Sequence, residues 1–201
     1  MELHGQVALV VIDVQRGEVM PQETGIPHMD GGAERHARIL ELVGSARAAE
    51  VPVVFIQEVH KRTLGDFGRE LDGAEGVHCL EGDAATELAD GLEPRPDEYL
   101  IRKRRYSAFF ATELDLVLRS YGASTLILVG ALTDICVHYT FADAHQHDYR
   151  CRVVTDCVGG SSQRAHDAAL EAMAYLQRDC LVEHADVLAA LHAMHPIAAG
   201  R

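Results

Sequence analysis

The stretch VALVVIDV, residues 7–14, is a short, largely β-branched apolar run in which the carboxylate of Asp13 follows six apolar residues. A run of this length and composition is typical of a buried strand. An apolar strand tolerates an aspartate only where its end comes to the surface, so Asp13 marks the end of the strand at one edge of a sheet.

The same type of run recurs along the chain and alternates with segments of helical spacing. Further strand-like runs lie at 51–59, 98–103, 124–130, 151–158 and 180–183, and helical patterns lie at 33–49, 111–122, 134–147, 162–179 and 185–194. Parallel strands need crossover helices between them, so six alternations predict a mainly parallel six-stranded sheet. We therefore expect an α/β protein with three α/β/α layers, Rossmann-like in organisation.

One domain accounts for the whole chain. The 201 residues are 48% apolar, which is enough for one substantial core, and no linker, repeat or low-complexity tract divides them. The irregular region at about 57–97 is rich in Gly, His and charge, and is too long for a simple connection. We assign residues 1–201 to a single domain and expect this region to contribute to function.

The charge balance excludes several classes of partner. Eighteen basic and thirty-one acidic residues leave a net charge of −13, which repels nucleic-acid phosphates and anionic membranes. No apolar run approaches the roughly 20 residues of a membrane span, and the amino-terminal run lacks a basic segment before it and a cleavage site after it. The five cysteines form no CxxC pair and are odd in number, which fits a reducing compartment. We expect a cytoplasmic protein that binds neither nucleic acid nor membrane.

Three residues that can carry chemistry follow strands of the predicted sheet. Asp13 ends the first strand, Lys103 ends the third, and Cys136 lies just past the fourth, in the segment GALTDICVHYT. Ligands of open α/β sheets bind beyond the carboxyl ends of the strands, so these residues are expected to meet. Each alone also has an ordinary role: Asp13 as a helix cap or surface carboxylate, Lys103 as one member of the solvated run RKRR, and Cys136 as a buried packing residue.

A nucleophilic role for Cys136 needs the thiolate. The helix opened by TDIC, with Thr133 or Asp134 as its N-cap, and the nearby Lys103 both favour the anion, so we expect the pKa of Cys136 to be lowered. Asp13 opposes that shift, but it can accept the thiol proton and return it to a leaving group while the lysine neutralises the pair.

Over nearly its whole length the chain resembles the isochorismatase-like cysteine hydrolases. The segments that carry the resemblance are ALVVIDVQ, KRRYSAFFATELDLVLRSYG and LILVGALTDICVHYTFADAHQHDYRCRVVTDCVGGSS. It implies an isochorismatase-like fold with Asp13, Lys103 and Cys136 as the catalytic triad. It also implies a cis peptide between Ala131 and Leu132, with the backbone amides of Leu132 and Cys136 as the oxyanion hole.

The resemblance also implies a reaction. Isochorismatases proper lack the cysteine nucleophile, so Cys136 favours the amidase branch: hydrolysis of a C–N bond other than a peptide bond in a small amide, carbamoyl or ureido substrate, through a thioester and without an organic cofactor. The alternatives are a nicotinamidase with a metal, a lactam hydrolase, and an isochorismatase-type hydrolase of a non-amide bond such as an enol ether or ester. A further possibility outside these enzymes is a non-catalytic, redox-responsive protein in which Cys136 is oxidised.

The resemblance to nicotinamidases extends to a metal motif, from which this chain departs. The matching segment QEVHKRTLGD has Glu58 and His60, but Asp66 stands where a second histidine is expected. We therefore expect no metal; Glu58, His60 and Asp66 are the residues that could gather a cation. Residues expected to line the substrate pocket are His60, Tyr106, Phe109, His138 and Tyr139. By resemblance, a homodimer or homotetramer is expected.

Overall fold

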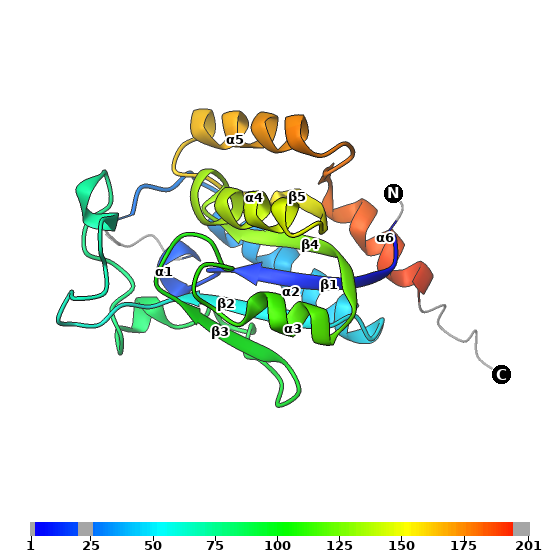
Figure 1. Ribbon diagram of the computed structural model, residues 1–201, viewed down its shortest axis with the longest axis horizontal. Coiled ribbons are helices and arrows are strands. Elements are labelled where there is room, and N and C mark those ends of the chain that lie inside the picture. The colour runs from blue at the N-terminus through cyan, green and yellow to red at the C-terminus, as the bar shows by residue number, and fades with distance from the viewer. Residues whose placement is uncertain (1–2, 20–25, 195–201) are drawn as a thin grey trace.

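A six-stranded, all-parallel sheet forms the centre of the protein (Figure 1). The computed structural model describes residues 3–19 and 26–194. In chain order the strands are β1 (Gln6–Ile12), β2 (Val53–Glu58), β3 (Tyr99–Lys103), β4 (Ala123–Ala131), β5 (Arg150–Gly159) and β6 (Leu181–Val182), and their order in the sheet is β3-β2-β1-β4-β5-β6. The predicted fold class is confirmed, and every strand pair is parallel.

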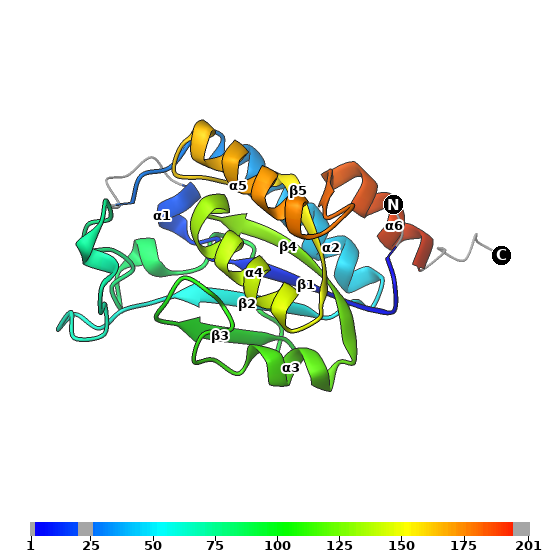
Figure 2. The same ribbon diagram turned by 45° about the horizontal axis from the view of Figure 1, so that its top comes forward.

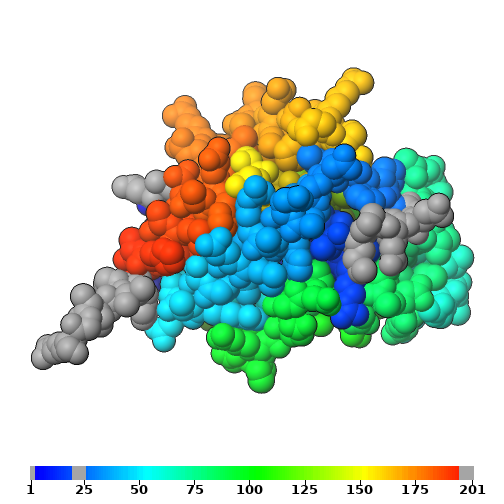
Figure 3. All heavy atoms as spheres, turned by 180° about the vertical axis from the view of Figure 1, so that it is seen from behind, coloured from blue at the N-terminus to red at the C-terminus, as the bar shows by residue number. Residues whose placement is uncertain are grey.

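Helices cover both faces of this sheet (Figure 2). The elements are α1 (Arg16–Val19), α2 (Gly32–Ala48), α3 (Leu114–Ser120), α4 (His138–Gln146), α5 (Gln163–Leu176) and α6 (His184–Met194). α3, α4 and α5 share one apolar core with the sheet, whereas α2 and α6 share the other. Seen from behind, α2 and α6 lie side by side on the surface (Figure 3). Among the described residues, no helix combines the length and apolar character that crossing a membrane requires.

Strand β1 shows how the sequence specifies the layers. Its even-numbered residues Ala8, Val10 and Ile12 belong to the core under α3, α4 and α5, and its odd-numbered residues belong to the core under α2 and α6. Successive side chains of a strand point to opposite faces, so a run that is apolar at every position requires cover on both sides. Burying each Val or Ile contributes about 1.5–3 kcal/mol, which holds the strand at the centre of the sheet.

From β1 the chain adds β2 and β3 on one side of the sheet and β4, β5 and β6 on the other, so the strand order changes direction between β1 and β4. In open α/β sheets a ligand crevice forms at such a switch point, beyond the carboxyl ends of the strands. Gly130 lies on β4 opposite Ile12 of β1, with a φ of 117°, and a Cβ there would lie 1.9 Å from the carbonyl oxygen of Ile12. Only glycine allows these two strands to approach so closely beside the crevice.

The segment between β2 and β3 folds over the carboxyl edge of the sheet (Figure 1). It has two single-turn 3-10 helices, Glu70–Asp72 and Ala84–Thr86, and is otherwise irregular, as the sequence predicted. The buried side chain of Gln15 fastens it: Nε2 donates to the carbonyl oxygens of Glu58, at 3.0 Å, and Thr86, at 2.7 Å. The long segment is thus part of the site region.

Candidate active site

Asp13, Lys103 and Cys136 lie together at the carboxyl edge of the sheet. Lys103 Nζ is 2.8 Å from Oδ2 of Asp13 and 3.3 Å from Sγ of Cys136. All three side chains are buried, and the lysine is only 1% exposed. A buried ammonium group persists only where anions or dipoles compensate the lost hydration, so the lysine is held as part of a charged group.

Glu58 is the fourth member of this group, and its contact with Lys103 was missed by the sequence analysis. It lies directly opposite Lys103 in the register of β2 and β3, and its Oε2 accepts from Nζ at 2.5 Å. The same oxygen lies 3.5 Å from Sγ of Cys136. β2 lies between β3, which carries Lys103, and β1, which Asp13 follows. The lysine side chain therefore extends across the end of β2, where it contacts Glu58 as well as Asp13.

The electrostatics of the group differ from the sequence expectation for the thiol. Burial raises the pKa of Cys136 well above its ordinary value; Lys103 opposes this, but Asp13 and Glu58 add to it. The expected lowering of the pKa was therefore wrong, because burial is the largest cause of the shift, and Glu58, which the sequence analysis did not place beside Cys136, adds to it. Ionisation of the Cys136 thiol is therefore disfavoured, and attack by its sulfur would need proton transfer to a nearby base.

Asp13 is suited to be that base. Burial raises the pKa of Asp13 to about 6, with Glu58 adding to the rise and Lys103 opposing it. Burial by itself lowers the pKa of Lys103, but Asp13, Cys136 and Glu58 together raise it well above its ordinary value. Near neutral pH the lysine is thus charged and the aspartate is largely ionised, close to the pKa that general-base catalysis favours.

The backbone before Cys136 is shaped by side-chain contacts to the loop ahead of α5. The Ala131–Leu132 peptide is cis, and a π-helical turn, Thr133–Val137, carries the cysteine into α4. Asp134 accepts from the backbone N–H of Ser161 at 2.8 Å and from its hydroxyl at 2.6 Å. The predicted capping role of Thr133 or Asp134 was wrong: the N-cap position is Leu132, without a side-chain cap.

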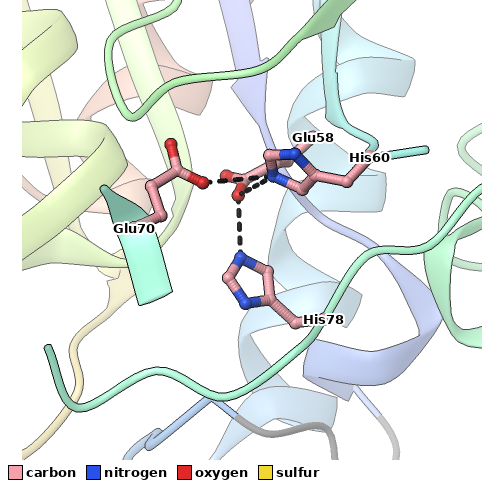
Figure 4. A group of neighbouring side chains, drawn as sticks. All are labelled: Glu58, His60, Glu70 and His78. Carbon is pink, nitrogen blue, oxygen red and sulfur yellow. Dashed lines mark hydrogen bonds and ion pairs between the residues drawn. The ribbon is translucent and has the colours of Figure 1, made fainter. Parts of the chain in front are cut away.

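A second cluster of ionisable side chains adjoins the triad through Glu58 (Figure 4). His60 and His78 both direct Nε2 at Oε1 of Glu58, at 3.2 and 3.0 Å. Glu70, from the first 3-10 turn, places Oε2 3.1 Å from Nε2 of His60. One ligand atom from each of the four residues lies within 4.8 Å of the other three, and all four side chains are buried. The arrangement concentrates two carboxylates and two imidazoles at one point.

The charges within this cluster support one another. Burial raises the pKa of the Glu58 carboxyl, but Lys103, His60 and His78 outweigh burial and hold it well below its usual range. Burial lowers the pKa of His60, but hydrogen bonds to Glu58 and Glu70 raise it to about 9. His78 directs Nδ1 at the carbonyl oxygen of Gly76, at 2.6 Å, and Nε2 at Glu58; burial lowers the pKa of His78, but its contacts with these two acceptors raise it above the ordinary value.

Asp66, a predicted member of any cation site, does not join this cluster. Its carboxylate accepts from the backbone N–H of Lys61 and pairs with Arg104 at 2.8 Å. It lies 3.8 Å from Nδ1 of His60, on the side of the ring away from Glu58. Glu70 and His78 take part instead, and no spacing rule could have found them, because the irregular path of the loop brings them to β2.

A cavity of about 200 Å³ opens beside the triad. Asp13, Cys136, Ala131, Leu132, His78 and Glu58 are among the residues that line it. Val77, Leu80, Ala85 and Tyr106 contribute much of the remaining wall. A space of this size accommodates a small molecule and not a folded protein chain.

The residues expected to line the pocket are distributed unequally. Tyr106 lines the cavity. His60 is fully buried beneath it, Phe109 packs on His147 with ring centroids 5.2 Å apart, and Tyr139 is 52% exposed at the surface. His138 is half-buried and is not among the cavity residues. Aromatic and histidine side chains near a catalytic segment pack or face solvent according to their helix face, which proximity in sequence does not reveal.

Comparison with known proteins identifies the family. Residues 7–184 match the isochorismatase domain. A probable inactive nicotinamidase of Arabidopsis thaliana is 32% identical over 167 residues, covering 80% of this chain and 84% of that protein. A ureidoacrylate amidohydrolase of Methylobacterium radiotolerans is 30% identical over 183 residues, covering 81% and 70%.

Solved structures show the same relationship. The N-carbamoylsarcosine amidase of Thermoplasma acidophilum superposes with a TM-score of 0.75 at 25% identity, covering 90% of this chain and 97% of that one. The match of the domain over most of the chain, together with the shared fold, shows that this protein belongs to the isochorismatase family.

Proposed function

We propose that the protein is an amidohydrolase that cleaves a C–N bond, other than a peptide bond, in a small amide, carbamoyl or ureido substrate. The observation that carries the proposal is the contact of one buried lysine with both an aspartate and a cysteine beside a small cavity. The names of the ureidoacrylate and N-carbamoylsarcosine relatives support the same class of bond.

In the first half of the reaction, Cys136 attacks the substrate carbonyl carbon. The proton of Sγ passes to Asp13 as the S–C bond forms, so the thiol need not ionise beforehand. Lys103 keeps its charge and holds the carboxylate against the thiol. The oxygen that becomes negative faces the backbone N–H groups of Leu132 and Cys136, which act as the oxyanion hole.

In the second half, the tetrahedral intermediate collapses and the C–N bond breaks. Asp13 returns the proton to the departing nitrogen, which leaves as ammonia or an amine, and a thioester remains on Cys136. Asp13 then takes a proton from a water molecule that attacks the thioester, and the acid product leaves as the thiol is restored. Every proton in this scheme comes from the thiol or from water, so the reaction balances without an organic cofactor.

Glu58, His60, Glu70 and His78 also fit a divalent cation, the group that a nicotinamidase-type enzyme of this fold would hold. Two carboxylates and two imidazoles are a donor set that suits several divalent metals. The two oxygens of Glu70 are buried and accept no well-directed hydrogen bond, although one lies near His60, so they remain available as donors. A cation bound there would supply Lewis acidity beside the cavity, which Glu58 and His78 line. This fit favours nicotinamidase-type amide hydrolysis as the second candidate.

A panel of small amides tests the proposal. The purified protein is incubated with primary amides, carbamoyl amides and ureido acids, with nicotinamide and a lactam included, and released ammonia or amine is measured. We expect turnover of at least one member and its loss in Cys136→Ala. The proposal is wrong if the wild type releases nothing across the panel or if Cys136→Ala retains the full rate.

A further inference from the structure

The charged side chains that line the cavity are mostly acidic. Five carboxylates line it, whereas none of the described lining residues is Arg or Lys. The carboxylates are those of Asp13, Glu18, Glu58, Glu75 and Asp83. Residues 20–25, which the structure does not describe, contain no Arg or Lys in their sequence.

Four of these carboxylates already have a cationic partner. Lys103, buried behind the cavity, serves both Asp13 and Glu58. Arg35 pairs with Glu18 at 3.0 Å, and Arg62 pairs with Asp83 at the outer rim. Each of these cations is therefore committed to a carboxylate of the protein, and none remains to receive a carboxylate from a substrate.

Glu75 is the exception among the five. It is half-buried in the cavity wall, and the described part of the chain provides it with no hydrogen bond or close ion pair. Burial raises the pKa of Glu75; the charge of His78 opposes the rise, and the charges of Glu58 and Glu70 add to it. Because it lines the cavity without a close cationic partner in the described chain, its carboxylate is available to a group of a bound molecule.

Of the two described histidines that line the cavity, His78 carries charge near Glu75 but has no ring nitrogen left for a substrate carboxylate. Both ring nitrogens of His78 are occupied, one by Gly76 and the other by Glu58. His28 is exposed at the mouth, with Nδ1 3.1 Å from the carbonyl oxygen of Ile26. A substrate carboxylate entering the cavity would lose hydration and meet the charge of Glu75, and the exposed imidazole of His28 is the remaining described lining group that could face it.

We propose that the cavity selects amide substrates that are neutral or cationic and excludes those that carry a carboxylate, and that Glu75 is the residue that sets this preference. The inference rests on the proposed amidohydrolase function and narrows its substrate class. A cationic or hydrogen-bond-donating group of the substrate would pair with Glu75 while its amide faces Cys136.

Three four-carbon amides that differ in charge test the preference. They are succinamate, succinamide and 4-aminobutanamide, and their dissociation constants are measured calorimetrically on Cys136→Ser, which removes turnover from the measurement. We expect succinamate to bind at least tenfold more weakly than succinamide, a difference of about 1.4 kcal/mol. In the Glu75→Gln background the gap should narrow, and in the Glu75→Lys background succinamate should bind best.

Glu171→Gln is the matched control, because Glu171 is exposed on α5 and does not line the cavity. It changes the net charge by the same amount and should leave the order of affinities intact. The inference is overturned if the three amides bind equally or if succinamate binds most tightly to the unaltered cavity. It is also overturned if the order of affinities does not depend on residue 75, or if none of the three amides binds. If the affinities follow the expected order but the wild type hydrolyses no amide, the inference on charge stands and the proposed reaction is wrong.

Discussion

Nζ of Lys103 lies 2.5 Å from Oε2 of Glu58, closer than the 2.8 Å that separates it from Asp13. The lysine of the triad therefore serves two carboxylates at once. Its positive charge is divided between the base of the proposed reaction and a residue that also contacts two histidines. The pH dependence and the stability of the site both follow from this division.

The first prediction concerns the pH profile of the wild type. Asp13 can accept the thiol proton only when it is ionised, so kcat/KM should rise as the pH rises through about 6, the raised pKa of Asp13. Initial rates between pH 4.5 and 8 check this. Asp13→Asn should lower kcat about 10²- to 10⁴-fold and remove the rise. A wild-type profile that is flat across this range would contradict the role of Asp13.

Glu58→Gln should move that profile. The charge of Glu58 raises the pKa of Asp13, so its removal lowers that pKa and shifts the acid limb of kcat/KM to lower pH. Glutamine keeps the size of the side chain and an acceptor for Lys103. Glu171→Gln, on the far helix surface, should leave the limb in place. An unchanged limb in Glu58→Gln would show that the two carboxylates do not interact.

Lys103→Met should destabilise the protein in a pH-dependent way. Loss of the cation leaves Asp13 and Glu58 buried without their shared partner, which costs about 3–5 kcal/mol. Without the lysine the pKa values of both carboxyls rise in the folded state, so protonation relieves the cost as the pH falls. Urea unfolding should therefore show a larger loss at pH 8 than at pH 5. Equal losses at the two pH values would refute this explanation.

Gly130→Ala should lower the free energy of unfolding. The new Cβ would lie 1.9 Å from the carbonyl oxygen of Ile12, and the φ of 117° strains any residue other than glycine. We expect a loss of more than about 2 kcal/mol in denaturant unfolding. Gly44→Ala is the control: it lies on α2 with no atom within 4 Å of the added Cβ, so it should gain about 0.5–1 kcal/mol. Similar effects of the two substitutions would be inconsistent with the close strand approach.

Cation binding can be measured apart from activity. Metal-free protein titrated with Zn²⁺ or Mn²⁺ should bind about one ion per chain, as judged by metal content after gel filtration. His78→Gln should abolish this binding, whereas His28→Gln, at the exposed mouth of the cavity, should retain it. Failure of the wild type to retain either metal would contradict the fit of the four side chains.

The sequence predicted the sheet and the position of the triad because both depend on local patterns. An apolar run that ends in Asp13, and another that ends before Lys103, place both residues at one edge whatever the loops do. The cis peptide that the family resemblance implied is present at Ala131–Leu132. The predictions of cytoplasmic location and of a homodimer or homotetramer stay predictions.

The remaining features depend on paths that local patterns do not encode. Glu58 looked like a candidate cation ligand, and its pairing with Lys103 emerged only once the register of β2 and β3 was known. Glu70 and His78 reach the site through an irregular loop whose course is fixed by contacts distant in sequence, such as those of Gln15. His60 lost its expected place in the pocket because the same loop buries it.

Four adjacent strands each carry one member of the group formed by the triad and Glu58, at or just beyond their carboxyl end, and this has a consequence for how the site assembles. The contacts among Glu58, Lys103 and Cys136 join residues 33 to 78 positions apart in the chain. No contiguous fragment with fewer than these strands can assemble the group, and such long-range pairing is slow to form. A partly folded chain therefore lacks these contacts, and the proposed nucleophile, Cys136, gains its charged neighbours only when all four strands are paired.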